Sequence, residues 1–301
     1  MSWRDVVLRA QGRHQWPIIQ WVLDNMPHEA GQLFRFLIFL GSDSIPARLF
    51  EAAAKSVDMQ DGVRQNLVPP LKPFFNVTEN KWDDKTFENA TSYLVQEQFL
   101  TYTTGDQKCF TVDQKLRTRT LKTLDHEYKR NLGGWVIALV SMAGSEDPQA
   151  VTLRQLYHCC ELAHRFITGL EENGRQFEFL SLWCTRLAEV CQVREAYSTA
   201  EELYTLSIGS GVGAKNWKAK FCLAVIRTAY LNKWSEAEAG IRDATSQGLP
   251  DEATLGSCTQ GLCNLLREWV LSREGKDSEL NNLKALLKIV YHEMKLRGRV
   301  K

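Results

Sequence analysis

Two stretches, YSTAEELY at residues 197–204 and WSEAEAGI at residues 234–241, carry the same pattern 37 residues apart. Each begins with an aromatic residue and continues with Ser-x-x-Glu, with Ala directly before the Glu. Ser at the N-cap and Glu three residues later form a capping box, in which each side chain satisfies a backbone N–H left unpaired at a helix start. We therefore predict that helices begin at Ser198 and Ser235, with Glu201 and Glu238 completing the two boxes.

Upstream of each predicted start lies a second run with helical spacing. Its apolar residues are Leu182, Leu187, Val190 and Cys191 in the first copy, and Phe221, Leu223, Ala224 and Ile226 in the second. A helix pair that recurs at this interval indicates a solenoid, because one pair cannot bury its apolar face without a neighbour. A third pair over residues 255–270 and 280–294 keeps the helical period but loses the Ser-x-Ala-Glu pattern, which is typical of a terminal, capping repeat.

The small and aromatic positions of these repeats resemble those of tetratricopeptide repeats. The matching residues are Leu187, Ala188, Tyr197 and Ala200 in the first copy, and Ala224, Val225, Trp234 and Ala237 in the second. The resemblance implies a surface that binds another protein or a peptide. Because polar residues on the first helix of such a repeat usually line the binding groove, the candidate partner-binding residues are Glu189 and Gln192.

The composition is that of an ordinary globular protein of 301 residues, 44% hydrophobic and 24% charged. The 37 basic and 36 acidic residues give a net charge of +1, so no global field draws the chain to nucleic acid or to an anionic membrane. The most apolar run, residues 33–40, is far too short to span a bilayer, and the first residues lack the apolar core of a secretory signal. We expect a cytoplasmic or nuclear protein.

Residues 1–130 predict a separate, winged-helix-like domain. A helix that is apolar nearly all round covers residues 31–40, a short helix runs from Pro46 to about Ala54, and an amphipathic helix covers residues 86–98. A β-hairpin follows, with strands at residues 99–103 and 109–112. Asn131-Leu-Gly-Gly134 is expected to break the next helix and to separate this domain from a tetratricopeptide-like domain at residues 131–301. The predicted fold class is mainly α with one small hairpin.

A winged helix raises the possibility of DNA binding, and the residues argue against it. The third helix has Lys85 as its only base, against Asp84, Glu88 and Glu97, and no Arg to contact guanine or phosphate. Basic residues follow the hairpin at Lys115, Arg117, Arg119 and Lys122. Their spacing, with leucines between them, favours a solvated helix face over a phosphate-binding patch.

No pattern of catalytic, cofactor-binding or metal-ligating residues is present, so we assign none. The cysteines of the helical runs form no CxxC pair and are read as small buried hydrophobes. The segment from Gly209 to Asn216 lacks the Gly-Lys-Ser/Thr end of a phosphate loop and is read as a connection between repeats. Glu161 lies three residues from both His158 and His164, which favours a surface Glu–His contact.

The order of motifs resembles the C-terminal part of fungal STAND proteins, the NB-ARC or NACHT, NLR-like NTPases that carry a winged helix followed by tetratricopeptide repeats. The similar stretches are WPII at residues 16–19, AGQLFRFLIFLGSDSIPARLF at 30–50, FTVD at 110–113 and QLYHC at 155–159. Two features depart from the family. Its nucleotide-sensing His would fall at Val112 or Asp113, and only residues 1–15 lie upstream, where the NTPase would be. The resemblance therefore implies a sensor-and-adaptor half without its switch, as a fragment or a stand-alone product.

The leading hypothesis is a non-enzymatic scaffold that binds another protein through its repeats, without cofactor, metal or membrane contact. One alternative is a winged-helix transcriptional regulator with the repeats as sensor. Another is the regulatory half of a split NTPase.

Overall fold

The computed structural model describes residues 3–9, 15–41, 44–56, 69–76, 81–104, 108–168, 174–209, 217–247 and 277–296. It is mainly helical with a small antiparallel sheet, which confirms the predicted fold class. The chain divides into two compact units, Met1–Gly169 and Leu170–Lys301. No helix in the described ranges is long and apolar enough to cross a membrane.

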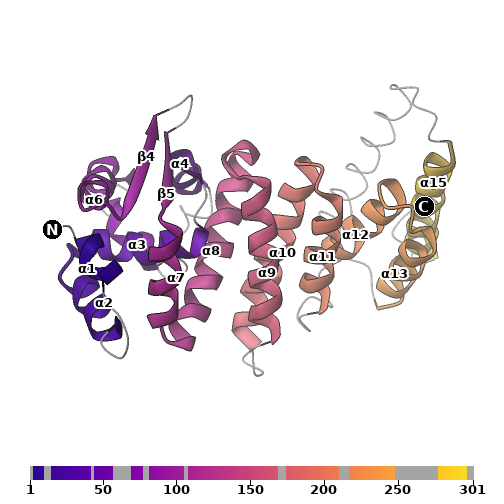
Figure 1. Cartoon of the computed structure of the whole chain (residues 1–301). Coiled ribbons are helices and arrows are strands. Elements are labelled where there is room, and N and C mark those ends of the chain that lie inside the picture. Colours follow the sequence, from indigo (N-terminus) through magenta and orange to yellow (C-terminus); the bar gives the residue numbers. More distant parts are fainter. Residues whose placement is uncertain are drawn as a thin grey trace. The chain divides into compact units, whose positions relative to one another are not determined.

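The first unit is built mostly of helices (Figure 1). Its longer elements are α1 (Trp3–Arg9), α2 (Gln15–Asp24), α3 (His28–Leu40), α4 (Ala47–Lys55), α6 (Asp84–Gln96), α7 (Gln114–Thr123), α8 (His126–Glu146) and α9 (Leu153–Thr168). Two 3₁₀ turns, η3 (Pro69–Phe74) and η4 (Pro148–Ala150), and the short strands β2 (Phe75–Asn76) and β3 (Lys81–Trp82) complete it. The β2–β3 pair lies between the predicted helices that end near residue 54 and begin at residue 86, where no element was predicted.

Helix α3 forms the centre of this unit, as its apolar sequence predicts. Leu33, Phe34, Phe36, Leu37 and Ile38 are completely buried. They pack with rings from other elements, for example Phe34 against Phe99 with ring centroids 5.0 Å apart and Phe36 against Phe50 at 6.4 Å. A helix that is apolar on every side in this way belongs in the interior of a domain.

The predicted hairpin is present as β4 (Leu100–Thr104) and β5 (Lys108–Val112), which pair antiparallel with Tyr102 opposite Phe110. A two-residue strand, β1 (Ile45–Pro46), adds to the other edge of β5, so that the strand order is β1-β5-β4. Figure 1 shows this hairpin beside α4 and α6. Pro46 then precedes α4, where its fixed φ and missing N–H are tolerated at a helix start.

The predicted helix break at residues 131–134 is wrong, because α8 runs without interruption through Gly133 and Gly134. A Cβ at Gly134 would lie 3.2 Å from the Phe166 ring of the neighbouring α9, so this glycine permits close helix packing, whereas a Cβ at Gly133 would make an ordinary contact with Leu162 at 3.7 Å. The following residues Val136, Leu139 and Val140 are completely buried within the first unit. Helices α8 and α9 therefore belong to the unit that ends at Gly169, and not to the domain predicted at residues 131–301.

The second unit consists of helix pairs. Helix α10 (Gly174–Val193) packs on α11 (Tyr197–Gly209), and α12 (Trp217–Ala229) packs on α11 and on α13 (Trp234–Gln247). Helix α15 (Asp277–Leu296) packs on α12 and α13, and its Leu283, Leu286 and Val290 are buried in the same apolar cluster as Phe221 and Ile241. The predicted helix over residues 255–270 and the connection at residues 210–216 lie outside the described residues.

The two capping boxes are not formed. Helices α11 and α13 begin at Tyr197 and Trp234, one residue earlier than predicted, because the carbonyls of Ala196 and Lys233 accept the first helical bonds, from Ala200 N–H at 3.0 Å and Ala237 N–H at 3.1 Å. Ser198 and Ser235 therefore lie inside the first turn. The 37-residue repeat is instead visible in the backbone, since Glu195 and Asn232 both adopt a left-handed conformation two residues before their helix.

Candidate functional site

Both predicted partner-binding residues have intramolecular partners. Glu189 on α10 forms an ion pair with Lys218 on α12. The Glu189 side chain is 34% exposed and that of Lys218 is 48% exposed. Gln192 accepts a hydrogen bond of 2.7 Å from the hydroxyl of Tyr204 on α11. Because Tyr204 is completely buried, Gln192 has a structural role, whereas Glu189 remains accessible at the surface.

Glu189 lies on an exposed stripe of α10. Leu182, Arg186, Glu189 and Val193 are spaced four, three and four residues apart, which places them on one side of a helix. Leu182 and Val193 expose 42% and 63% of their surface, high values for aliphatic side chains. The guanidinium of Arg186 lies 5.0 Å from the ring centroid of Trp183. We call these four residues, with Lys218 of α12, the α10–α12 face.

A buried network holds α10 against α11 beneath this face. The hydroxyl of Ser207 donates to the Ser181 carbonyl at 2.9 Å, and the hydroxyls of Thr185 and Ser207 lie 2.8 Å apart. All three residues are buried, so their mutual hydrogen bonds offset the loss of water. The network fixes the position of α10, and the exposed stripe is consequently presented on a rigid helix.

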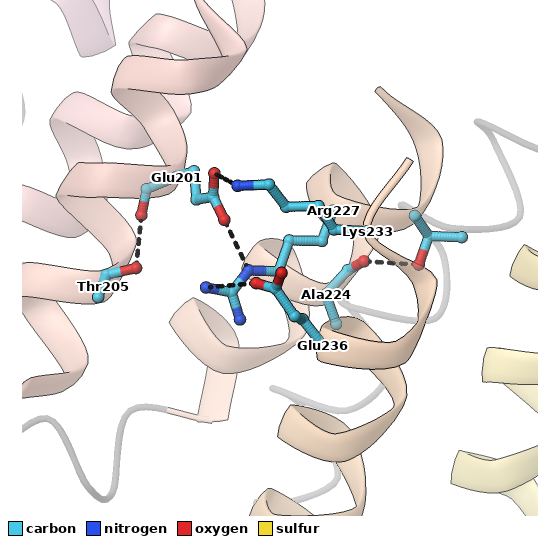
Figure 2. Close-up of polar contacts among 7 residues, drawn as sticks. Glu201, Thr205, Ala224, Arg227, Lys233 and Glu236 are labelled. Atoms are coloured by element: carbon cyan, nitrogen blue, oxygen red, sulfur yellow. Dashed lines mark hydrogen bonds and ion pairs between the residues drawn. The ribbon is translucent and has the colours of Figure 1, made fainter. Parts of the chain in front are cut away.

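The junction between the two repeats is a charged network around Glu201 (Figure 2). Its carboxylate accepts from Arg227 Nε at 2.8 Å and from Lys233 Nζ at 2.7 Å, and Arg227 Nη2 lies 3.7 Å from a carboxylate oxygen of Glu236. The Glu201 side chain is only 13% exposed. Glu201 was predicted to complete a capping box in the first repeat. It instead connects α11 with α12 and with the residue that precedes α13.

The two repeats differ at this position. In the second copy the equivalent Glu238 pairs with Arg242 one turn further along the same helix, at 2.7 Å, on the surface. Sequence comparison of the copies held a signal for the difference: Arg227 and Lys233 have Val190 and Ala196 as their counterparts 37 residues earlier. At these two positions only the second copy has basic residues, and both bind Glu201 of the first copy.

The environment of Glu201 shifts its ionisation. Burial alone would raise the pKa of this carboxyl, but the hydrogen bonds from Lys233 and Arg227 outweigh it and lower the pKa below its ordinary value. Glu201 is therefore ionised in the folded protein. The contacts fit a structural junction, since every charge of the network is matched within it.

A groove of about 300 Å³ runs beside this junction between α11, α12 and α13. Leu223, Ala224 and Ala237 form its apolar floor, and Arg227, Glu236, Lys220 and Asp243 bring balanced charge to it. Gly240 faces open space, so the groove is not closed on that side. It offers a second candidate binding surface in this unit.

The cysteines predicted to be buried hydrophobes are largely so. Cys159, Cys160, Cys184 and Cys191 are buried and Cys222 is half-buried, while Cys258 and Cys263 lie outside the described residues. Burial raises the pKa of Cys184 and of Cys191 to about 12, and that of Cys222 to about 11. Their thiols therefore stay protonated near neutral pH, which disfavours nucleophilic or ligand chemistry.

The expected surface contact between Glu161 and the histidines is replaced by other contacts. His158 Nε2 lies 2.6 Å from the Phe39 carbonyl, and Glu161 lies 4.0 Å from Arg165. Burial lowers the pKa of His158, only partly opposed by the bond to Phe39. His158 thus connects α9 with the end of α3, a contact between residues 119 positions apart that helical spacing cannot indicate.

The basic stretch after the hairpin is only partly the solvated face that the sequence favours. Lys115 and Lys122 are exposed, but Arg117 Nε donates to the Ile38 carbonyl at 2.7 Å and Arg119 donates to the Val7 carbonyl at 3.2 Å. Asp113, one of the two positions at which the resemblance would place a nucleotide-sensing His, caps α7 and pairs with Arg4 at 3.1 Å. Val112, the other position, is buried at the end of β5.

Helix α6 borders an acidic, aromatic-floored groove of about 550 Å³. Asp84 and Glu88 of this helix and Glu51 of α4 line it, with Lys108 as the one basic residue among the described lining. Its floor contains Phe87, whose ring centroid lies 5.3 Å from that of Trp82. A surface of this charge repels phosphate.

Comparison with protein-family models, curated proteins and solved structures finds no match.

Proposed function

We propose that this chain is a non-enzymatic adaptor that binds a segment of another protein through the α10–α12 face. The observation that carries the proposal is the exposure of Leu182 and Val193 on the same stripe as Glu189. An aliphatic pair that borders charged groups on a rigid helix suits recognition of a partner, because association removes its apolar surface from water. The resemblance to tetratricopeptide repeats and to the sensor part of STAND proteins supports the same function.

The face specifies the chemistry of the partner segment. Leu182 and Val193 lie at the two ends of the stripe, so we expect apolar side chains in the partner, about three helical turns apart along α10. The Glu189–Lys218 pair between them offers one acceptor and one donor group. A segment with two apolar anchors and a polar residue between them is therefore favoured over a uniformly charged one.

The test uses the full chain in a peptide-display selection, followed by affinity measurement of the selected peptides. Val193→Asp and Glu189→Lys should each weaken binding about tenfold or more, equal to about 1.4 kcal/mol. Glu127→Lys is the matched control, since Glu127 is exposed on α8 in the other unit. Peptides that bind all three variants as well as the wild type would show that this face is not the binding surface.

Binding to nucleic acid stays outside the proposal. The groove beside α6 is acidic, and Arg119 donates to the Val7 carbonyl within the protein. Duplex DNA titrated at about 50 mM salt, where phosphate contacts are strong, should show no binding. A steep loss of affinity between 50 and 200 mM salt, roughly the range over which counterion release is measured, would instead favour the transcriptional-regulator alternative.

A further inference from the structure

A small polar cavity of about 230 Å³ lies within the first unit, apart from the face discussed above. The end of α3, strand β1, helix α7 and the first turns of α9 surround it. The residues that determine its chemistry are Arg117, Thr152, Arg154, Gln155, His158 and Glu161. Its volume is below the roughly 300–1,000 Å³ of pockets for drug-sized molecules, so it suits a small group.

The N-terminus of α9 opens onto this cavity through a well-formed capping box. Gln155 N–H donates to Thr152 Oγ1 at 3.2 Å, and Thr152 N–H donates to Gln155 Oε1 at 2.9 Å. The box fixes the first turn of a helix of 16 residues. The positive end of the helix dipole and the remaining N–H groups of that turn therefore favour an anion nearby.

A buried donor in the same turn lacks a partner. Gln155 is only 5% exposed, and its oxygen is used by the N–H and the hydroxyl of Thr152. Its amide nitrogen Nε2 has no hydrogen-bond partner among the described residues. Buried amide donors are rarely left unpaired in native proteins, and an orphan of this kind often marks a bound water or ion.

The charges around the cavity are mostly positive. Arg117 and Arg154 line it, and Arg117 also donates through Nε to the Ile38 carbonyl at 2.7 Å. His158 lines it as well, but its Nε2 faces the Phe39 carbonyl and burial lowers its pKa, so it is not counted among the positive charges. The opposing charge is Glu161, which Arg165 approaches to 4.0 Å. Two arginines and a helix N-terminus are the groups that proteins commonly use to bind oxyanions.

We propose that this cavity binds a phosphate-type oxyanion, held by Arg117 and Arg154 at the N-terminus of α9 with the Gln155 amide as a buried donor. The anion is either free phosphate or the phosphate group of a phosphorylated side chain on another protein. The site lies on elements separate from the α10–α12 face and does not depend on the adaptor function proposed there.

Calorimetric titration of the full chain with inorganic phosphate tests the site, with Gln155→Glu as the central variant. Glu retains the capping box with Thr152, so the variant should keep its thermal stability, but it replaces the buried donor with a negative charge. Phosphate affinity should fall at least tenfold. Arg154→Ala, a change at an exposed residue, should weaken binding about fivefold to tenfold, whereas Lys122→Ala, at an exposed residue of α7 outside the lining, should leave it unchanged.

Two further arms complete the experiment. A short phosphoserine peptide that binds at least tenfold tighter than phosphate would assign the site to a phosphorylated partner, and the reverse order would assign it to the free ion. Absence of phosphate and phosphopeptide binding at millimolar concentration would overturn the proposal. So would equal losses in Arg154→Ala and Lys122→Ala, because the attraction would then be a general effect of surface charge.

Discussion

Glu201 and Glu238 occupy the same position in two repeats and have different partners, which allows a matched test at a single residue. Glu201→Gln replaces a carboxylate that accepts from both Arg227 and Lys233. It should lower the free energy of unfolding by about 1.5–3 kcal/mol, the range for hydrogen bonds to charged groups. Glu238→Gln, which loses only a surface i,i+4 pair, should cost about 0.3–0.5 kcal/mol in urea denaturation.

The same pair of variants has a defined pH dependence. Because the folded protein holds the pKa of Glu201 below its ordinary 4.5, the contribution of this carboxylate is fully present above that pH and is lost as the pH falls through the folded pKa. The stability difference between wild type and Glu201→Gln should therefore shrink in acid. A difference that stays constant from pH 7 to about pH 3 would contradict the ionic origin of the effect.

Gln192 and Glu189, which the sequence predicts together as partner-binding residues, should differ in their effect on stability when substituted. Gln192→Ala removes the oxygen acceptor of the buried Tyr204 hydroxyl and leaves it only the Cys222 thiol as a partner, so it should lower stability by about 1–3 kcal/mol. Glu189→Ala removes one half of a partly exposed ion pair and should change stability by less than about 1 kcal/mol. Thermal unfolding of both variants measures the contrast, and equal losses would show that the Tyr204–Gln192 bond adds nothing.

At the scale of elements, the turn between α10 and α11 is a place where a substitution should increase the stability of the first repeat. Glu195 has φ of 58° and Asn232 has φ of 53°. A left-handed conformation costs an ordinary residue roughly 1–2 kcal/mol, whereas Asn tolerates it and Gly adopts it freely. Allowing for the entropy that Gly loses on folding, Glu195→Gly should stabilise the chain by about 0.5–1 kcal/mol in urea denaturation.

Asn232→Gly serves as the control for this turn and should gain less, since Asn already suits the conformation. A loss of stability in Glu195→Gly would mean that the Glu195 side chain contributes more than its backbone strain costs.

Elements with local signals were predictable from the sequence, and those set by distant contacts were not. The uniform apolar run of α3 and the alternating residues of β4 and β5 led to the elements that the structure contains. The Ser-x-x-Glu pattern misled in both copies, because Arg227 and Lys233 bind the Glu201 carboxylate and Arg242 binds that of Glu238. A capping box does form between Thr152 and Gln155 at the start of α9. It was not predicted, although its two residues have the same spacing as the Ser and Glu of the repeats.

At the scale of the whole molecule, the position of the domain boundary determines which fragments fold. The pair of glycines at 133–134 predicts a boundary after residue 130, whereas α8 is continuous and packs on α4 inside the first unit. Glycine lowers helix propensity by about 1 kcal/mol, which the burial of a whole helix face easily exceeds. The local signal was real, but tertiary packing of α8 and α9 overrides it.

A fragment of residues 1–169 should therefore unfold cooperatively, and a fragment of residues 1–130 should not. The shorter fragment lacks Val136, Ile137, Leu139, Val140 and Met142, all at most 1% exposed. Burial of each such side chain contributes about 1.5–3 kcal/mol, so their loss approaches the roughly 5–15 kcal/mol by which a whole domain is stable. Circular dichroism during urea titration distinguishes the two. A sharp transition for residues 1–130 would show that the core around α3 forms without α8, and would restore the boundary that the glycine pair predicts.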